Sequence, residues 1–181
     1  MDILLGLPVA TVKLFFSAVF LISGWQKISG ASDFRKILAG YQLLPSHWLP
    51  VASLGIAGSE LVLGIALLTP QWSDTALIAT ASLLLLYMAV MWRSLLAGRS
   101  DIDCGCSGAA GPSGINGLLL VRNALLAAAA LVASVTPASI GLTVWAWVFA
   151  LLGAVVLLLL FHACNQLIAN HDLKGRLSHH A

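Results

Sequence analysis

Two of the three cysteines stand almost side by side, as Cys104-Gly105-Cys106, in the longest polar interval between hydrophobic segments. Two cysteines with one residue between them can close a small, strained disulfide, and strain makes such a bond easy to exchange. Gly105 supplies the backbone freedom that the ring needs. The neighbouring Asp101 and Asp103 oppose thiolate formation. The spacing favours a redox pair, with Cys104 and Cys106 as the catalytic residues of a thiol–disulfide oxidoreductase.

Two other interpretations of the cysteine pair stay open. Two soft thiolates can bind Cu(I), although no methionine or histidine stands nearby in the sequence. Alternatively, Cys104 and Cys106 are incidental residues of a loop. Cys164, far along the chain, is typical of a small packing residue in a helix and is also a candidate third thiol. His162, two residues before it, is likewise either a packing residue or a functional one. No pattern names a quinone or a complete copper site, so we predict no cofactor and no metal.

Composition decides the class of protein that carries these cysteines. The chain has 181 residues, of which 60% are hydrophobic and only 9% are charged, and its mean hydropathy is +0.97. Soluble domains carry roughly 25% charged residues, so this chain is predicted to be an integral membrane protein in a lipid bilayer. The net charge of +2 is too small to indicate nucleic-acid binding.

Hydrophobic stretches of about 20 residues are long enough to span a bilayer as helices, because lipid offers no hydrogen-bond partner to irregular backbone. Five stretches qualify, and together they predict one all-α, multi-pass membrane domain: 7–28, 49–69, 74–96, 115–135 and 140–168, within a single domain 1–181. The first is expected to be a retained span, because it opens with Asp2 rather than with a basic region.

A surface helix is expected between the first two spans. Trp25 and Lys27 close the first span and suit the membrane interface. The following stretch, 29–48, then repeats apolar residues at helical spacing with basic residues opposite, which is typical of an amphipathic helix on the membrane surface. The apolar residues are Phe34, Ile37, Leu38 and Tyr41, and the basic ones are Arg35 and Lys36.

Polar residues inside the spans predict a buried cluster of Lys27, Glu60, Arg122 and Asn123. Glu60 is the one charge of the second span, and an unpaired carboxylate there costs about 2.5–3.5 kcal/mol. At 1.5 Å per residue Glu60 lies ~16 Å and Arg122 ~10 Å from the end that carries the cysteines, so these two are expected to pair, with Lys27 as the other candidate partner. Glu60 is then either a structural ion-pair member or a proton-relay carboxylate facing a cavity.

Small residues indicate where helices approach closely. Ser23 and Gly24 end the first span, and Gly55, Gly58 and Gly64 surround Glu60 in the second. Small side chains let neighbouring backbones come near one another, which is how helices associate in lipid. The first two spans are therefore expected to pack tightly.

Positive charges predict the orientation. Alternating spans place the 29–48 segment, the cysteine segment and the C-terminal end on one side, and that side has seven of the nine positive residues: Lys27, Arg35, Lys36, Arg93, Arg99, Lys174 and Arg176. By the positive-inside rule the cysteines face the cytoplasm and the N-terminus lies outside. Disulfide chemistry belongs to the oxidising side, so this orientation conflicts with a redox role for the cysteines.

Several motifs resemble the DoxX-like membrane proteins, and within them the MauE branch, the methylamine-utilisation protein E group. The resemblance covers roughly residues 10–135, and its motifs are Phe20–Lys27 (FLISGWQK), Tyr41–Pro45 (YQLLP), Ser59–Leu67 (SELVLGIAL), Asp103–Gly108 (DCGCSG) and Val121-Arg122-Asn123. It implies a bundle of four core transmembrane helices plus a fifth, in the cytoplasmic (inner) membrane of a bacterium.

The resemblance also implies a function. Such a protein is required for maturation of methylamine dehydrogenase, whose exported small (beta) subunit has many disulfides, and a thioredoxin-like partner of the MauD type is expected beside it. Cys104 and Cys106 then match the redox pair, while Lys27, Glu60 and Arg122 match only as polar positions without a role. Two alternatives remain: a non-catalytic membrane scaffold or transport helper for the same subunit, and a small-molecule or metal permease with Glu60 lining the path.

Overall fold

The computed structural model describes residues 2–98, 114–136 and 143–178, and within these it describes side chains for residues 6–98, 114–136 and 143–171. The elements are α1 (Asp2–Ser29), α2 (Ala31–Gly40), the 3-10 turn η1 (Ser46–Trp48), α3 (Leu49–Leu68), α4 (Ser73–Leu96), α5 (Gly117–Val135) and α6 (Val144–Ser178). No strand occurs in the described ranges.

Five of these helices, α1, α3, α4, α5 and α6, are long and apolar enough to cross a membrane, which confirms the predicted all-α multi-pass membrane class. Three helices have boundaries that differ by more than one residue from the predicted ones: α1 begins at Asp2 rather than at 7, and α6 begins at Val144 rather than at 140. The α5 helix begins at Gly117, because the side chain of Asn116 accepts a hydrogen bond from the Leu119 backbone N–H at 3.1 Å and so caps it. The α6 helix continues to Ser178, beyond the predicted end at Ile168.

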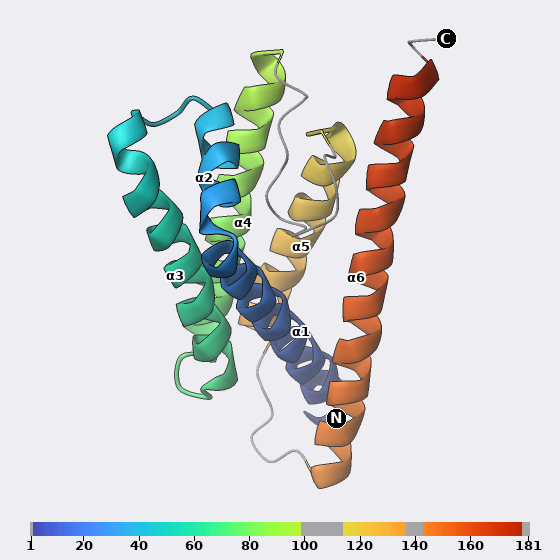
Figure 1. The fold of residues 1–181 in the computed structure, drawn as a ribbon. Helices are drawn as coiled ribbons and strands as arrows, with labels where there is room; N and C mark the ends of the chain where they lie inside the picture. Colours follow the sequence, from blue (N-terminus) through green and yellow to red (C-terminus); the bar gives the residue numbers. More distant parts are fainter. Residues whose placement is uncertain (1, 99–113, 137–142, 179–181) are drawn as a thin grey trace.

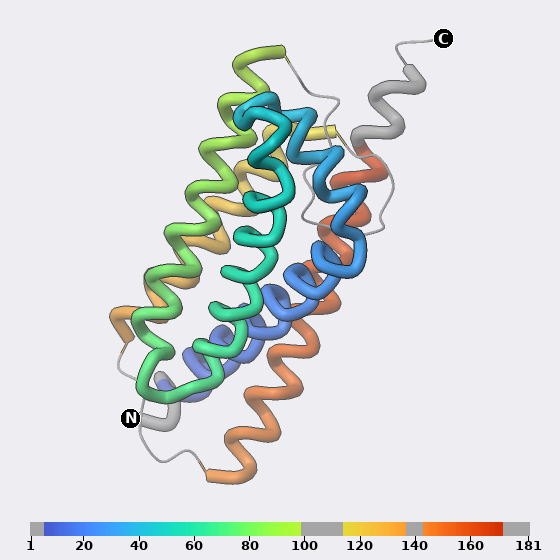
Figure 2. Tube along the Cα trace, turned by 60° about the vertical axis from the view of Figure 1, so that its left-hand side comes forward, coloured from blue at the N-terminus to red at the C-terminus, as the bar shows by residue number. Residues whose placement is uncertain are grey.

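The helices form a four-membered bundle with a fifth helix alongside (Figures 1 and 2). The most extensive packing is between α1 and α3 and between α4 and α5, while α6 packs mainly on α1. The core contains three phenylalanines of α1 and alanines of α5. On α6 the face that packs inward is made of alanines, Ala146, Ala150 and Ala154, and most of its other side chains are exposed. The predicted arrangement of four core helices and a fifth is therefore present.

The α1 helix ends inside the bundle, and α2 continues the chain from there. Figures 1 and 2 show α1 ending part-way along the bundle, and α2 then running along the bundle beside α3. Its amphipathic character is as predicted: Phe34 is buried, while Arg35 and Lys36 are exposed. It ends at Gly40, within the predicted stretch 29–48, and Gln42 then adopts a left-handed conformation with φ of 50° that turns the chain toward η1.

Two glycines account for the close approach of α1 and α3. A Cβ added at Gly24 would lie 2.9 Å from the backbone oxygen of Ala57, and one at Gly64 would lie 2.7 Å from Leu21. In addition, the Ser17 hydroxyl donates a hydrogen bond to the Gly64 carbonyl oxygen at 2.7 Å. Tight packing of these helices is confirmed at Gly24 and Gly64.

The other two glycines that were expected to take part do not. A Cβ added at Gly55 or Gly58 would have no neighbour within 4 Å. Neither residue therefore takes part in the close contact with α1. Such a contact involves residues three or four apart on one face of a helix. Proximity to Glu60 in the sequence was therefore misleading about which glycines pack.

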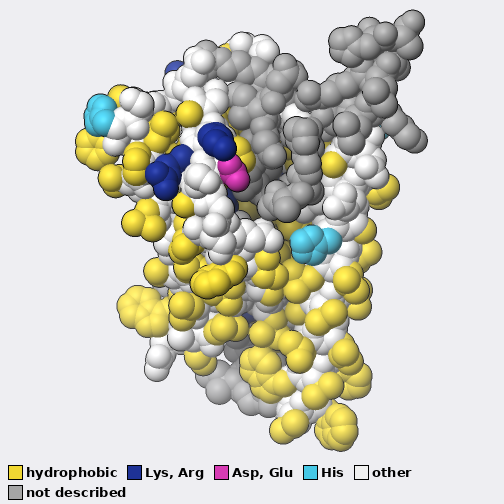
Figure 3. Space-filling view, viewed as in Figure 1, with side chains coloured by type: hydrophobic (Ala, Val, Ile, Leu, Met, Phe, Trp, Pro, Cys, Tyr) yellow, Lys and Arg dark blue, Asp and Glu magenta, His cyan; other side chains and the backbone are white. Residues whose placement is uncertain are grey.

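The molecular surface separates charged from apolar side chains (Figure 3). On the face shown, lysine and arginine gather near the end where α2 lies, and hydrophobic side chains predominate in the lower part of the view. Arg35, Lys36 and Arg93 are all exposed at that end. Lys27 was expected to join them, but it is buried, so its side chain does not reach the membrane interface as predicted.

Candidate functional site

The ion pair between Lys27 and Glu60 is the centre of the buried polar residues. Lys27 comes from the last turn of α1 and Glu60 from the middle of α3, and their side chains are 6% and 1% exposed. The Lys27 ammonium donates to Glu60 Oε1, and it donates a second hydrogen bond to the Ser23 hydroxyl at 2.8 Å. Because Gly24 lets α1 and α3 approach closely, the two charges are in direct hydrogen-bonding contact.

Tyr87 of α4 completes this half of the cluster. Its hydroxyl donates a hydrogen bond to the same carboxylate oxygen, Glu60 Oε1, at 2.8 Å. The Lys27 ammonium lies 5.4 Å from the ring centroid of Phe34 and 5.5 Å from that of Tyr87, within the range of cation–π attraction. Four elements thus meet at Lys27, and the charge is held by a carboxylate, a hydroxyl and two aromatic rings.

Arg122 forms the second half of the cluster, on α5. Its guanidinium donates to the side-chain oxygen of Asn165 on α6, and at 3.5 Å to that of the adjacent Asn123. It also lies 5.3 Å from the ring centroid of Phe161, again on α6. No carboxylate among the described residues lies within ion-pair distance of Arg122. Arg122 therefore ties α5 to α6 through neutral partners.

A small cavity of about 40 Å³ joins the two halves, and Lys27, Glu60, Arg122 and Asn123 all line it. Three buried polar atoms have no hydrogen-bond partner within the described part of the chain and belong to residues around this cavity: Glu60 Oε2, Arg122 Nε and Asn123 Nδ2. One is an acceptor and two are donors, so their hydrogen-bonding capacities are complementary. The cavity exceeds the roughly 10–15 Å³ that a water molecule needs, so a bridging water fits between them.

The structure thus gathers the four predicted residues around one cavity but pairs them differently. Glu60 binds Lys27, which was the second of the two expected partners, and it makes no direct ion pair with Arg122. Lys27 was predicted at the membrane interface because the first span was expected to end there. Since α1 ends part-way along the bundle, Lys27 reaches the depth of Glu60.

Two contributors were missed by the sequence reasoning: Tyr87 and Asn165. A signal for Tyr87 was present, because it lies nine residues from the end of α4, or about 14 Å at 1.5 Å per residue, close to the depth estimated for Glu60. For Asn165 no comparable signal exists, because α6 packs mainly on α1, and the sequence does not show which residue of α6 reaches Arg122.

The cysteine pair, Cys104 and Cys106, lies outside the described residues, as do Asp101 and Asp103. The described chain leads toward that segment from Gly98, after α4, and resumes at Gly114, before α5. Cys164 is a free, exposed cysteine on α6. In residues 2–98, 114–136 and 143–178, no group of three or more His, Cys, Asp or Glu side chains is arranged to hold a metal ion.

Comparison with known proteins decides the family. The model of the family described as "Methylamine utilisation protein MauE" matches residues 5–136, which cover α1 to α5. The chain belongs to the MauE family. Both Cys104 and Cys106 fall inside the matched region, together with Lys27, Glu60 and Arg122, whereas Asn165 on α6 falls outside it.

Individual members of the MauE family are similar over most of their length. The chain is 26% identical to the methylamine utilization protein MauE of Paracoccus denitrificans, over 91% of this chain and 93% of the relative. It is 30% identical to that of Methylophilus methylotrophus, over 91% and 88%, and 30% identical to that of Paracoccus versutus, over 71% and 69%. No solved structure matches the chain. The MauE family is thus associated by name with methylamine utilisation, and the chain is one of its multi-pass membrane proteins.

Proposed function

We propose that this protein supports the maturation of an exported enzyme subunit, the small subunit of methylamine dehydrogenase, by thiol–disulfide exchange at Cys104 and Cys106 with a thioredoxin-like partner of the MauD type. One observation carries the proposal: the Cys-Gly-Cys sequence lies inside the region that matches a family of methylamine utilisation proteins. A maturation factor for a disulfide-rich, exported client needs a membrane position and an exchangeable disulfide, and this chain combines a membrane fold with a closely spaced cysteine pair.

A single turnover of the exchange balances, with the Cys104–Cys106 disulfide as the two-electron oxidant. A thiolate of the reduced partner attacks one sulfur of the Cys104–Cys106 disulfide, which breaks that bond and forms a mixed disulfide. The partner's second thiol then attacks the mixed disulfide and releases the other cysteine. Two electrons and two protons pass from the partner to this chain, so the partner leaves oxidised and Cys104 and Cys106 become thiols. The oxidised partner next transfers its disulfide to the client in the same manner.

The buried cluster supports this proposal as a rigid base for the exchange. Lys27, Glu60 and Tyr87 connect α1, α3 and α4, while Arg122 and Asn165 connect α5 to α6. The helices that flank the cysteine segment, α4 and α5, each hold one of these polar residues about two to three turns from the segment. A fixed geometry of the flanking helices is what a strained, exchangeable cysteine pair requires.

Orientation is part of the proposal, because an exported client meets its partner on the outer side of the inner membrane. The buried, paired Lys27 no longer counts among the positive residues at the cysteine end, yet Arg35, Lys36 and Arg93 are exposed there and favour the cytoplasm. Thiol exchange on the outer side therefore requires an orientation opposite to the one that these positive residues favour. Labelling of the cysteines with a membrane-impermeant thiol reagent, in intact cells and with or without reductant, measures the side directly.

Replacing both cysteines, as Cys104→Ser with Cys106→Ser, tests the function. We expect mature, disulfide-bonded client to fall by at least about tenfold, measured by the mobility shift of alkylated small subunit on gels and by enzyme activity. The matched control is Cys164→Ser, an exposed cysteine on α6, which should leave maturation unchanged. Equal amounts of the three chains in the membrane must be verified by immunoblot.

Normal maturation with the Cys104/Cys106 double variant would contradict the exchange and favour a non-catalytic scaffold. In that case substitutions in the helix faces, and not in the cysteines, should abolish maturation. Loss of maturation in the Cys164→Ser control would show that the third thiol takes part, and the two-cysteine scheme would then be wrong.

A further inference from the structure

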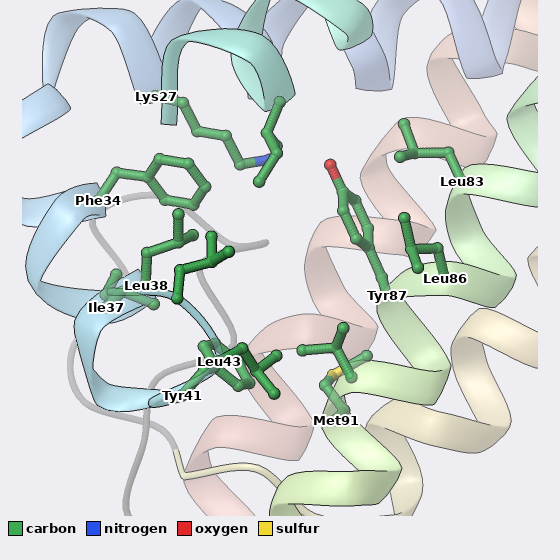
Figure 4. Close-up of a pocket in the computed structure, with 13 residues that line it drawn as sticks. Lys27, Phe34, Ile37, Leu38, Tyr41, Leu43, Leu83, Leu86, Tyr87 and Met91 are labelled. Atoms are coloured by element: carbon green, nitrogen blue, oxygen red, sulfur yellow. The ribbon is translucent and has the colours of Figure 1, made fainter. Parts of the chain in front are cut away.

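A second cavity, larger than the small one, is also lined by Lys27. It has a volume of about 410 Å³ and lies between α2, the segment after α2, and α4 (Figure 4). Small-molecule sites typically measure about 300–1,000 Å³ and are mostly apolar with a few placed polar groups. Here the apolar walls come from leucines, isoleucine, valine and methionine, and Lys27 and Tyr87 lie at one end.

The polar end of this cavity has a hydrogen-bond donor to offer. An ammonium group has three N–H donors, and Lys27 gives one to Glu60 and one to Ser23. Figure 4 shows the Lys27 side chain reaching between Phe34 and Tyr87, which stand on opposite sides of the cavity. The ammonium is 5.4 Å and 5.5 Å from these two ring centroids and lines the cavity, so the one N–H that it gives to neither Glu60 nor Ser23 is available to a ligand there.

Charge decides which kind of head group fits. The Lys27 ammonium and the Glu60 carboxylate together are neutral, and both are almost fully buried. An anionic head, such as a fatty-acid carboxylate or a lipid phosphate, would be brought close to Glu60 in a low-dielectric site and repelled. A neutral carbonyl oxygen accepts the remaining N–H without that repulsion, and a flat ring beside it can stack against Phe34 and Tyr87.

The cavity is reachable from the lipid. Leu43, Leu44 and Leu86 line it and are also exposed on the outside of the bundle. Leu86 belongs to the span of α4, where the surrounding surface is apolar. A molecule dissolved in the bilayer can therefore enter between α2 and α4 without crossing water, and an apolar tail can remain in contact with lipid.

From the cavity, its neutral polar end and its opening we infer that this protein has a binding site for a lipid-soluble quinone, with the ring between Phe34 and Tyr87 and a ring carbonyl accepting from Lys27. No motif in the sequence indicated such a site. The site is formed only when α1 ends part-way along the bundle and α2 covers the space beside α4.

A quinone at this site would deepen the proposed function, and only this redox step rests on that function. Each exchange leaves Cys104 and Cys106 as two thiols, which must return to the disulfide. The oxidation of two thiols to one disulfide releases two electrons and two protons, and the reduction of one quinone to its quinol takes up two electrons and two protons. A bound quinone therefore balances the regeneration of the disulfide.

Binding is tested with the full chain in nanodiscs of quinone-free phospholipid, by photolabelling with an azido-ubiquinone analogue and mapping of the labelled peptides. We expect label in the segments that line the cavity, at Tyr41–Leu44 and Leu83–Met91, and competition by decylubiquinone. Decanoate and decanol carry an alkyl chain without the ring and should compete at least tenfold more weakly. Equal competition by decanoate would overturn the quinone assignment in favour of a fatty-acid site.

Two substitutions in one turn of α4 provide a matched pair. Leu83 lines the cavity and Leu85 does not, so Leu83→Trp should fill the site and weaken labelling at least about tenfold, while Leu85→Trp should not change it. Phe34→Leu keeps an apolar wall but removes one aromatic face, and should weaken binding about two- to tenfold. Unchanged, competable labelling of the Leu83→Trp protein would show that the quinone binds elsewhere or only partitions into lipid.

The cysteine variant separates this inference from the proposed function. The Cys104/Cys106 double serine protein should still bind quinone but fail to form quinol, measured by ultraviolet absorbance after addition of reduced thioredoxin-like partner. If the native chain binds quinone and forms no quinol, the redox scheme is wrong while the site stands. If quinol forms but labelling of the cavity does not occur, the site is wrong.

Discussion

Lys13 and Lys27 lie about four turns apart on α1, and each binds a carboxylate from the α3–α4 hairpin. Lys13 donates to Asp74 at 2.9 Å and to the Ser73 hydroxyl at 2.8 Å, at the start of α4. Lys27 donates to Glu60 in the middle of α3. The contacts are chemically alike, but Asp74 is 62% exposed and Glu60 only 1%.

The difference in exposure predicts how much the protein depends on each ion pair for its stability. Lys13 is only 12% exposed, but its partner Asp74 is open to water, which screens the attraction, so this pair gains little, and Lys13 also has the Ser73 hydroxyl as a partner. A buried pair gains little in net terms too, since both charges lose their hydration, yet removal of one partner leaves a charge that nothing compensates. The Lys13–Asp74 pair can therefore be lost with little effect, whereas Lys27 and Glu60 depend on each other.

Among single substitutions at the carboxylates of the two ion pairs and at Tyr87, Glu60→Gln should have the largest effect. It leaves the Lys27 ammonium buried without a counter-charge, so we expect the free energy of unfolding to fall by about 3–5 kcal/mol. The measurement is reversible unfolding in mixed micelles of detergent and SDS, followed by circular dichroism. A loss no greater than that of Asp74→Asn would break the comparison between the two pairs.

A double substitution, Lys27→Met with Glu60→Met, tells a structural pair from a functional one. Both charges disappear while similar volume remains, so most of the stability lost in Glu60→Gln should return. Client maturation is then measured with this stable protein. Normal maturation would identify the pair as purely structural, and loss of maturation would identify a functional demand for the charges.

Tyr87→Phe should have an intermediate effect. It removes the hydroxyl that donates to Glu60 Oε1 and keeps the ring over Lys27, and hydrogen bonds to charged groups contribute about 1.5–3 kcal/mol. We expect a decrease in this range by the same unfolding measurement. The effect should shrink when Glu60→Gln is already present, because the two residues share one interaction. Full additivity would show that Tyr87 acts through another contact.

Asp74→Asn should have the smallest effect, less than about 1 kcal/mol. What effect there is should decrease further between low and high salt, because the Debye length falls from about 30 Å at 0.01 M to 3 Å at 1 M. The loss in Glu60→Gln should be nearly insensitive to salt. A salt-sensitive Glu60→Gln effect would mean that the pair is accessible to ions and water.

Much of the fold was predictable because lipid imposes a length on every span. The stretches 49–69 and 74–96 match α3 and α4 within one residue at each end, since helix is the one way to satisfy their backbone in hydrocarbon. The identity of the four clustered polar residues, of which Lys27, Glu60 and Asn123 are buried and Arg122 is partly buried, was also accessible. Glu60 and Arg122 are each the one charged residue of their predicted spans.

Pairing among those residues was not predictable from depth. Counting residues places a side chain along the membrane normal but says nothing about which face of the helix carries it. Glu60 pairs with Lys27 of α1, and Arg122 binds Asn165 of α6, so similar depths brought Glu60 and Arg122 to one cavity but not into a direct ion pair. The large cavity was hidden for a similar reason, because its walls come from α2 and α4, which are far apart in sequence.

The pairing of Lys27 with Glu60 also bears on how the chain enters the membrane. On its own, α3 would expose a carboxylate to hydrocarbon, at about 2.5–3.5 kcal/mol. Next to α1 the same residue meets a cation and the combined charge is zero. The earlier helix is synthesised first, and it holds its lysine near the end that the next span will follow. Membrane insertion and helix docking are thereby coupled: α3 becomes stable in lipid as it finds α1, so a substitution at Lys27 should reduce the amount of inserted protein even where the finished bundle tolerates it.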